Sequence, residues 1–364
     1  MSKLVYLGRS EIREKLINSE LFPEFEVTEI TDQNRMVDKS DLNRNDYVLI
    51  LVDPVKQLYN NLLEQGFKES QIVNVVCTYG AIHGINYLLS SSPIELFITG
   101  LSYARGIHED LLPVEALNLS YAGQDLLLDY CIARHVIETR KANLPKYAII
   151  GLSYYSFNYE FIKTQPSTNN EINSTRWITW PGLVCRYRYL LKYNDVTPIH
   201  DLSSHQAPDV SIYLEHTKLY KSPLESLYVV PLPKRIKVIN SEMKPFPNER
   251  RVEAAIRVSR KYYPDSITVN VRVLDSYLSL LIDNNIKPII VVHPQHSEYI
   301  KHFSPHMVEQ FRATMRSLKT KYEFQLFDCF DSGLINDCDY KDADHLNMKA
   351  QIEFTEYLSQ VIEW

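Results

Sequence analysis

The feature that most constrains the fold is a repeated alternation of short apolar segments with longer segments of helical periodicity. From residue 94 onward, four segments have the length and composition of buried strands: IELFITG (94–100), YAIIGLS (147–153), KPIIVVHP (287–294) and FQLFDCF (324–330). Stretches with helical spacing of apolar residues lie at 124–142, 270–285, 305–321 and 347–362. Because strands that alternate with helices pair in parallel, this pattern predicts an α/β fold with a parallel sheet.

The N-terminal part shows the same alternation on a smaller scale, with strand signals at 3–8, 25–30, 47–52 and 70–76. Gly8 follows the first of them but does not begin a G-x-G-x-x-G sequence, which a dinucleotide site would use. We therefore expect residues 1–85 to form a small Rossmann-like α/β accessory domain. Under the alternative of a working nucleotide site, Asp53 at the end of the third strand is the residue to examine.

A run of serines and a proline at 90–93 predicts a boundary, so that the second domain spans residues 94–364. Within it, residues from about 155 to 265 are rich in Pro, Asn and Tyr and have poor periodicity. This segment predicts an insertion of loops and short helices over one end of the sheet. Long insertions of this kind often form lids and substrate walls.

Charge and composition exclude several classes of protein. The formal net charge is -6, which argues against a general nucleic-acid binder. No apolar run reaches the ~20 residues needed to cross a bilayer, and the N-terminus lacks the apolar core of a secretory signal. The five cysteines form no CxxC pair or zinc spacing and suggest reduced thiols. We therefore expect a cytoplasmic protein.

Polar residues follow the predicted strands where each one ends. Ser102 follows the first strand of the second domain and Ser153 closes the next, while His293 and His296 follow the third. Ligands of open α/β sheets bind beyond the carboxyl ends of the strands, so these side chains are expected at one edge. The two histidines are predicted to line the pocket and bind substrate, with a structural or surface role as the alternative.

The segment DYKDADHLN (339–347) supplies the groups that a serine nucleophile needs, because its hydroxyl requires a base and the base requires an orienting acceptor. His345 is the candidate base and Asp342, three residues earlier, the candidate acceptor, whereas Asp344 is expected to point away. Two alternatives stay open. Ser102 could serve solely as the N-cap of a helix over 103–112, and His345 could have a purely structural role.

A divalent metal is a further alternative for this acidic segment, with five candidate ligands: Asp337, Asp339, Asp342, Asp344 and His345. The EF-hand pattern fails because its glycine is absent and Lys341 stands at a ligand position. A solvated or triad-linked loop is therefore favoured, and we expect neither a metal nor a cofactor.

Residues 94–364 resemble the SGNH (GDSL-like) family of hydrolases and acyltransferases, in particular members from bacterial cell-surface polysaccharide pathways. The resemblance lies in GLS (100–102), in NLSYAGQD (118–125) and in DADH (342–345). It implies a three-layer α/β/α sheet of flavodoxin-like type, with Ser102 as nucleophile and His345 and Asp342 as its partners. It also implies that the N–H groups of Ser102 and Gly123 bind the oxyanion.

One block departs from the family pattern. Where the family has G-x-N-D, this chain has GLSY (151–154), so Ser153 takes the place of the asparagine that donates to the oxyanion. Asn158, five residues later, is the candidate substitute. Losing one oxyanion donor typically costs about 10²–10³ in turnover.

The resemblance implies a serine esterase or O-acyltransferase that acts on an acyl group of a carbohydrate or another small acylated substrate. Homo-oligomer formation is left open. The alternative is a non-catalytic SGNH-like protein that binds glycans or acts as a scaffold in polysaccharide biosynthesis. Transfer of a group other than acyl, such as a phosphate ester, is a third reading.

Overall fold

The computed structural model describes residues 62–67, 93–161 and 246–364 in full, together with the backbone of four strands in the first 74 residues. Gly8, Asp53, the boundary signal at 90–92 and most of the predicted insertion lie outside the described residues. The chain separates into two compact units, one containing the first four strands and the other containing residues 93–161 and 246–364. Each unit is described by itself.

The N-terminal unit contains a four-stranded sheet whose neighbouring strands are all parallel. Its strands are β1 (Ser2–Leu7), β2 (Phe25–Ile30), β3 (Tyr47–Ile50) and β4 (Ile72–Asn74), in the order β2-β1-β3-β4. The predicted small parallel sheet is therefore confirmed, with strand positions within a few residues of those expected.

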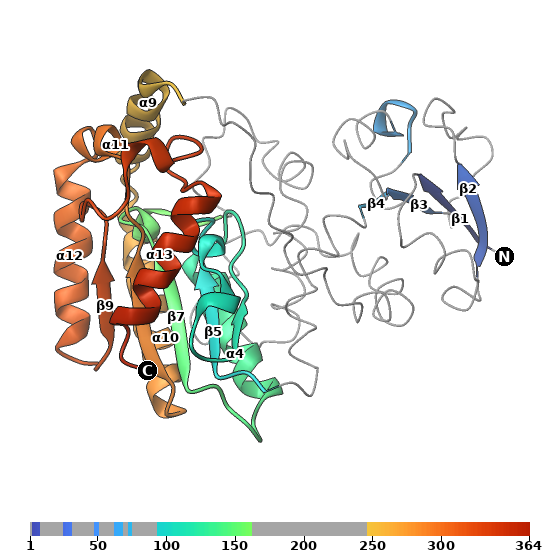
Figure 1. Ribbon diagram of the computed structural model, residues 1–364. Helices are drawn as coiled ribbons and strands as arrows, with labels where there is room; N and C mark the ends of the chain where they lie inside the picture. Colours follow the sequence, from blue (N-terminus) through green and yellow to red (C-terminus); the bar gives the residue numbers. More distant parts are fainter. Residues whose placement is uncertain are drawn as a thin grey trace. The chain divides into compact units, whose positions relative to one another are not determined.

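The second unit is built on a five-stranded, all-parallel sheet (Figure 1). Its strands are β5 (Leu96–Gly100), β6 (Ala116–Asn118), β7 (Tyr147–Leu152), β8 (Lys287–Val292) and β9 (Gln325–Asp328). The order is β6-β5-β7-β8-β9, the doubly wound order of flavodoxin-like sheets. Four of these strands were predicted. The fifth, β6, has only three residues and therefore too little pattern to be recognised.

Six α-helices accompany this sheet in the described part of the chain. They are α4 (Leu126–Thr139), α9 (Asn248–Ser259), α10 (Pro264–Asp283), α11 (Ser297–Lys301), α12 (Pro305–Lys319) and α13 (Met348–Val361). Helix α10 begins six residues before the predicted start, because Pro264 occupies its first turn, a position that proline favours. Helix α9 forms a regular helix within the segment that was predicted as loops and short helices.

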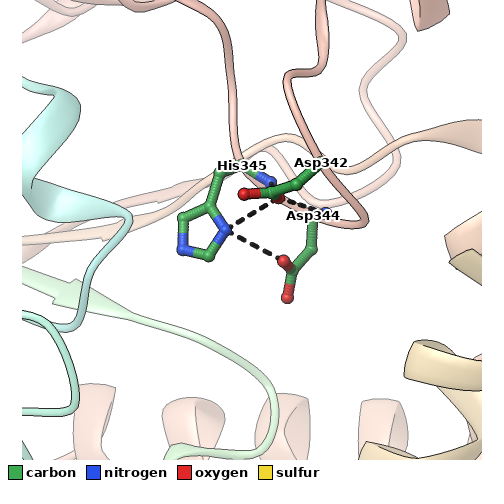
Figure 2. A group of neighbouring side chains, drawn as sticks. All are labelled: Asp342, Asp344 and His345. Carbon is green, nitrogen blue, oxygen red and sulfur yellow. Dashed lines mark hydrogen bonds and ion pairs between the residues drawn. The ribbon is translucent and has the colours of Figure 1, made fainter. Parts of the chain in front are cut away.

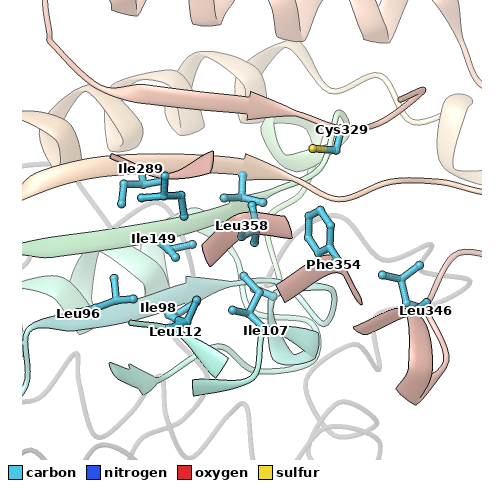
Figure 3. Packing of buried hydrophobic residues seen from close by; sticks show 14 of the residues in the cluster. Leu96, Ile98, Ile107, Leu112, Ile149, Ile289, Cys329, Leu346, Phe354 and Leu358 are labelled. Carbon is cyan, nitrogen blue, oxygen red and sulfur yellow. The ribbon is translucent and has the colours of Figure 1, made fainter. Parts of the chain in front are cut away.

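Side chains along each strand point alternately to the two faces of the five-stranded sheet, and helices cover both faces. On one face, Leu96, Ile98 and Ile149 pack with Phe354 and Leu358 of α13 (Figure 3). All five side chains are nearly inaccessible to solvent, and burial of such a side chain stabilises a fold by roughly 1.5–3 kcal/mol.

The opposite face of the sheet carries α4 and α10 (Figure 1). Buried Thr99 of β5 forms a hydrogen bond with the Tyr277 hydroxyl of α10, with 3.0 Å between the oxygens. The second unit therefore has three layers, as predicted.

The described residues contain no helix long and apolar enough to cross a membrane. Cys131, Cys329 and Cys338 are free thiols, as expected, while Cys77 and Cys185 lie outside the described residues.

Candidate active site

Ser102 lies immediately beyond the carboxyl end of β5, on a turn that two glycines make possible. Gly100 has a φ of +131°, and a Cβ atom there would lie 2.4 Å from the carbonyl oxygen of Gly151 on the neighbouring strand. The Gly100 N–H donates to Oδ1 of buried Asp129 on α4, at 2.9 Å. This buried bond holds the end of β5 and therefore the start of the turn that carries Ser102.

The structure does not use Ser102 as a helix cap. The next helical turn is a 3-10 helix at Ala104–Gly106, and Tyr103 occupies its N-cap position. The Ser102 side chain instead points to a residue 243 positions later in the chain. Its Oγ lies 2.7 Å from Nε2 of His345.

Asp342 holds the other side of the His345 ring. Its Oδ1 lies 2.9 Å from Nδ1 of His345 and also accepts the backbone N–H groups of Asp344 and His345. A tight turn before α13 thus folds the carboxylate back onto the imidazole, as the spacing predicted. When Nδ1 donates to Asp342, the Nε2 atom of a neutral ring is left as an acceptor toward Ser102. The structure therefore brings Ser102, His345 and Asp342 together in one row.

Asp344 also reaches the imidazole, so the prediction that it points away is wrong. Its Oδ1 lies 3.0 Å from Nδ1 of His345 (Figure 2). The physical reason is Tyr103, whose hydroxyl donates to the second oxygen of this carboxylate at 2.6 Å. The Tyr103 ring also stacks on His345, with 4.9 Å between the ring centroids.

The two carboxylates change the charge of the site. Burial disfavours the imidazolium, but the hydrogen bonds and charges of Asp342 and Asp344 outweigh it and raise the pKa of His345 to about 9. Burial also disfavours the charged form of Asp342. Its bonds to His345 and to two backbone N–H groups prevail and lower the pKa of Asp342 to about 2. At neutral pH the free site therefore holds an imidazolium between two carboxylates.

Arg251 anchors the loop that carries these residues. This arginine of α9 is 3% exposed and donates to the carbonyl oxygens of Tyr340, Asp342 and Ala343. Its guanidinium also lies over the rings of Phe246 and Tyr340. The sequence offered no signal for this role, because the partners are backbone carbonyls about 90 residues away.

The other two aspartates of the acidic segment are bound elsewhere. Asp337 accepts the backbone N–H and the hydroxyl of Ser297, and Asp339 pairs with Lys349. Within the described residues, the group that could hold a metal ion is limited to Asp342, Asp344 and His345. Its donors are one imidazole nitrogen and carboxylate oxygens, all within 4.8 Å of one another. The expected absence of a metal stays a prediction.

The candidate oxyanion donors differ in what holds them. Gly123 lies in a turn with a φ of +76°, and its carbonyl accepts the Tyr159 hydroxyl at 2.7 Å. Within residues 93–161 and 246–364, no atom accepts a hydrogen bond from the N–H of Ser102 or of Gly123. Both N–H groups are therefore available to a ligand.

Ser153 and Asn158, the predicted substitutes for the family's asparagine, are both buried. The backbone N–H of Ser153 donates to the Ser156 hydroxyl at 2.9 Å. The Asn158 side chain donates to Gln310 and accepts from the backbone N–H of Tyr263. Asn158 thus ties its segment to α12 and to the start of α10, and its contribution to an oxyanion site stays a prediction.

His293 and His296 have different surroundings. His293 is 3% exposed and lies between the rings of Tyr103 and Phe354, and neither ring nitrogen has a hydrogen-bond partner among the described residues. Burial and the neighbouring His345 lower the pKa of His293 to about 3. His296 caps α11 by accepting the Glu298 N–H at its Nδ1. This capping bond supports the structural role of His296 that is the alternative to substrate binding.

Comparisons with known proteins add no assignment. No family model matches the chain, and no curated protein matches it.

Proposed function

We propose that the protein is a serine esterase or O-acyltransferase of the SGNH type, which acts on an acyl ester of a carbohydrate. The observation that carries the proposal is the row of Ser102, His345 and Asp342, with distances of 2.7 and 2.9 Å between successive partners. This is the arrangement in which a base activates a serine and a carboxylate orients the base. The carbohydrate part rests on the resemblance of residues 94–364 to the family.

In the first half of the reaction, Ser102 Oγ attacks the acyl carbonyl carbon and its proton passes to Nε2 of His345. The carbonyl oxygen becomes an oxyanion, which the N–H groups of Ser102 and Gly123 are placed to bind. When the tetrahedral intermediate collapses, the bond to the leaving alcohol breaks and His345 returns the proton to that oxygen. The acyl group is then esterified to Ser102.

In the second half, an acceptor hydroxyl attacks the acyl-serine while His345 takes its proton. The bond between the acyl carbon and Ser102 Oγ then breaks, and His345 returns the proton to Oγ, which restores the free serine. Water as acceptor gives hydrolysis, and a sugar hydroxyl gives transfer. Asp342 stabilises the imidazolium in both halves without itself taking up the proton. The reaction needs the neutral imidazole at each start.

The alternative of a non-catalytic binding protein has two specific observations in its favour. The side chain of Asn158 is engaged with Gln310 and Tyr263, and Ser153 replaces the asparagine of the family pattern. A site with one oxyanion donor fewer would be slow, by about 10²–10³ in turnover.

Labelling with a fluorophosphonate probe separates the two functions. We expect the wild-type protein to be labelled and to hydrolyse acetyl esters, and the Ser102→Ala variant to do neither, because the attacking oxygen is gone. Ser332→Ala is the matched control, since Ser332 donates to the Cys329 carbonyl and has no part in the triad. Equal labelling and turnover in wild type and Ser102→Ala would overturn the proposal.

A further inference from the structure

A half-buried cation, Lys261, lies against two tyrosine rings of the second unit. Lys261 follows the last turn of α9, and its Nζ lies 5.9 Å from the ring centroids of both Tyr155 and Tyr159. Within residues 93–161 and 246–364, no carboxylate forms an ion pair with it. Burial and then the charge of Arg257 lower its pKa, because both disfavour the charged ammonium form.

Arg257 places a second positive charge beside the first. It lies four residues before Lys261, in the last turn of α9, and its guanidinium is exposed to solvent. Lys261 lies two residues beyond the end of α9, and the charge of Arg257 acts on it and lowers its pKa, so the two like charges repel. Faces of tyrosine rings attract a cation but leave its charge in place. The local electrostatics therefore favour an anion at this position.

A layer of aromatic side chains connects this cation pair to the triad. The Tyr155 ring, which Lys261 contacts, lies 6.5 Å from the Tyr103 ring, and Tyr103 stacks on His345. Buried Tyr299 is within electrostatic reach of both Asp344 and Arg257. Lys261 is thus linked to His345 through the rings of Tyr155 and Tyr103.

We propose that Lys261 and Arg257 form a subsite for an anionic group, a carboxylate or a phosphate, on the sugar whose acyl ester is placed at Ser102. This inference rests on the proposed function and narrows the substrate to charged carbohydrates. The ring faces of Tyr155 and Tyr159 provide an apolar surface for the sugar, and the two cations hold its charge. Lys261 approaches the anion as a point charge, while the Arg257 guanidinium can bind two oxygens at once.

The test compares matched acetyl esters: a neutral methyl glycoside, a uronic acid and a sugar phosphate. In the Lys261→Gln variant, kcat/KM is expected to fall about tenfold or more for the two anionic esters and to change less than about twofold for the neutral one. Lys261→Arg is expected to restore the preference. Lys287→Gln is the matched control, because Lys287 also lies over a tyrosine ring but at the start of β8, away from the carboxyl ends of the strands.

Comparison of the uronic acid ester with the sugar phosphate ester also shows whether the bound group is a carboxylate or a phosphate. Equal losses for neutral and anionic esters, or a loss of folding stability with unchanged preference, would assign Lys261 and Arg257 to the C-terminus of α9, where the helix dipole favours cations, and overturn the subsite.

A binding measurement separates failure of the subsite from failure of the proposed function. Calorimetric titration of the uronic acid and of the sugar phosphate, both without the ester, into Ser102→Ala needs no catalysis. Binding that disappears in Ser102→Ala/Lys261→Gln supports the subsite even if no ester is hydrolysed. Absence of binding to Ser102→Ala, with normal ester hydrolysis by the wild type, overturns the subsite alone.

Discussion

At the scale of single residues, the chemistry of the site depends on the charge state of His345. Its Nδ1 lies near two carboxylates, whereas a typical triad supplies one. The additional carboxylate of Asp344 stabilises the imidazolium, and a charged ring cannot accept the Ser102 proton. For the proposed reaction, the raised pKa of His345 therefore predicts a low rate at neutral pH.

The first prediction concerns the pH profile of ester hydrolysis. With the pKa of His345 raised to about 9, kcat/KM of the wild type is expected to rise roughly tenfold per pH unit up to about pH 9, because only the neutral ring acts as a base. Asp344→Asn removes one stabilising charge, so its rising limb is expected at lower pH. Rates measured from pH 6 to 10 with both proteins check this, and coincident profiles would contradict it.

At the scale of elements, the site is held by contacts between segments that are distant in the sequence. Helix α9 supplies Arg251 to the loop at 340–343, and α4 supplies Asp129 to the end of β5. Arg251 and Asp129 both form hydrogen bonds with backbone atoms. Each bond therefore fixes the path of the backbone and, with it, the position of the side chains that this backbone carries.

Arg251→Leu tests the first attachment. The change removes the donor from three carbonyls, of which that of Tyr340 belongs to a buried residue, and an unsatisfied buried group costs about 1–3 kcal/mol. We expect a free energy of unfolding lower by about 2 kcal/mol or more and a kcat reduced by about tenfold or more, because Asp342 loses its support. Urea titration and ester hydrolysis measure the two effects. Exposed Arg250 is the matched control, and Arg250→Leu should change neither.

An equal response of the Arg250 and Arg251 variants would show that α9 does not position the loop. Retention of full activity by a destabilised Arg251→Leu protein would show that the anchor serves folding alone.

At the scale of the whole molecule, two histidines link folding stability to pH in opposite directions. The pKa of His345 is raised to about 9, so its contribution to stability is complete below 6.5 and is lost as the pH rises through about 9. The pKa of buried His293 is lowered to about 3, so the unfolded chain binds a proton as the pH falls through 6.5 and the folded chain does not. Both effects place the stability maximum near pH 6.5.

His293→Phe isolates the acidic half of this linkage. In the wild type, His293 contributes a loss of about 1.4 kcal/mol per pH unit below 6.5, until its folded pKa is reached. The variant cannot take up this proton, so its free energy of unfolding should depend less steeply on pH. Urea titrations at pH 4.5, 5.5 and 6.5 measure the slope, and equal slopes in the two proteins would contradict the prediction.

Much of the architecture could be predicted from local pattern. Apolar runs and helical periodicity located eight strands and four helices, because buried strands and amphipathic helices leave a signal within their own residues. The three-residue strand β6 was missed because so short a segment has no periodicity. Helix α9 was missed because its polar, arginine-rich sequence NERRVEAAIRVS buries few apolar side chains.

What the sequence by itself determined is the alternation of strands and helices and the short-range pairing of Asp342 with His345, since both depend on residues close together in the chain. Only the tertiary structure decided that Ser102 faces His345 across 243 residues, that Asp344 turns toward the imidazole, and that Arg251 holds their loop. The physical reason is that these contacts join segments that are distant in the sequence. Their approach depends on the order of the strands and on packing, which the residues next to each contact do not encode.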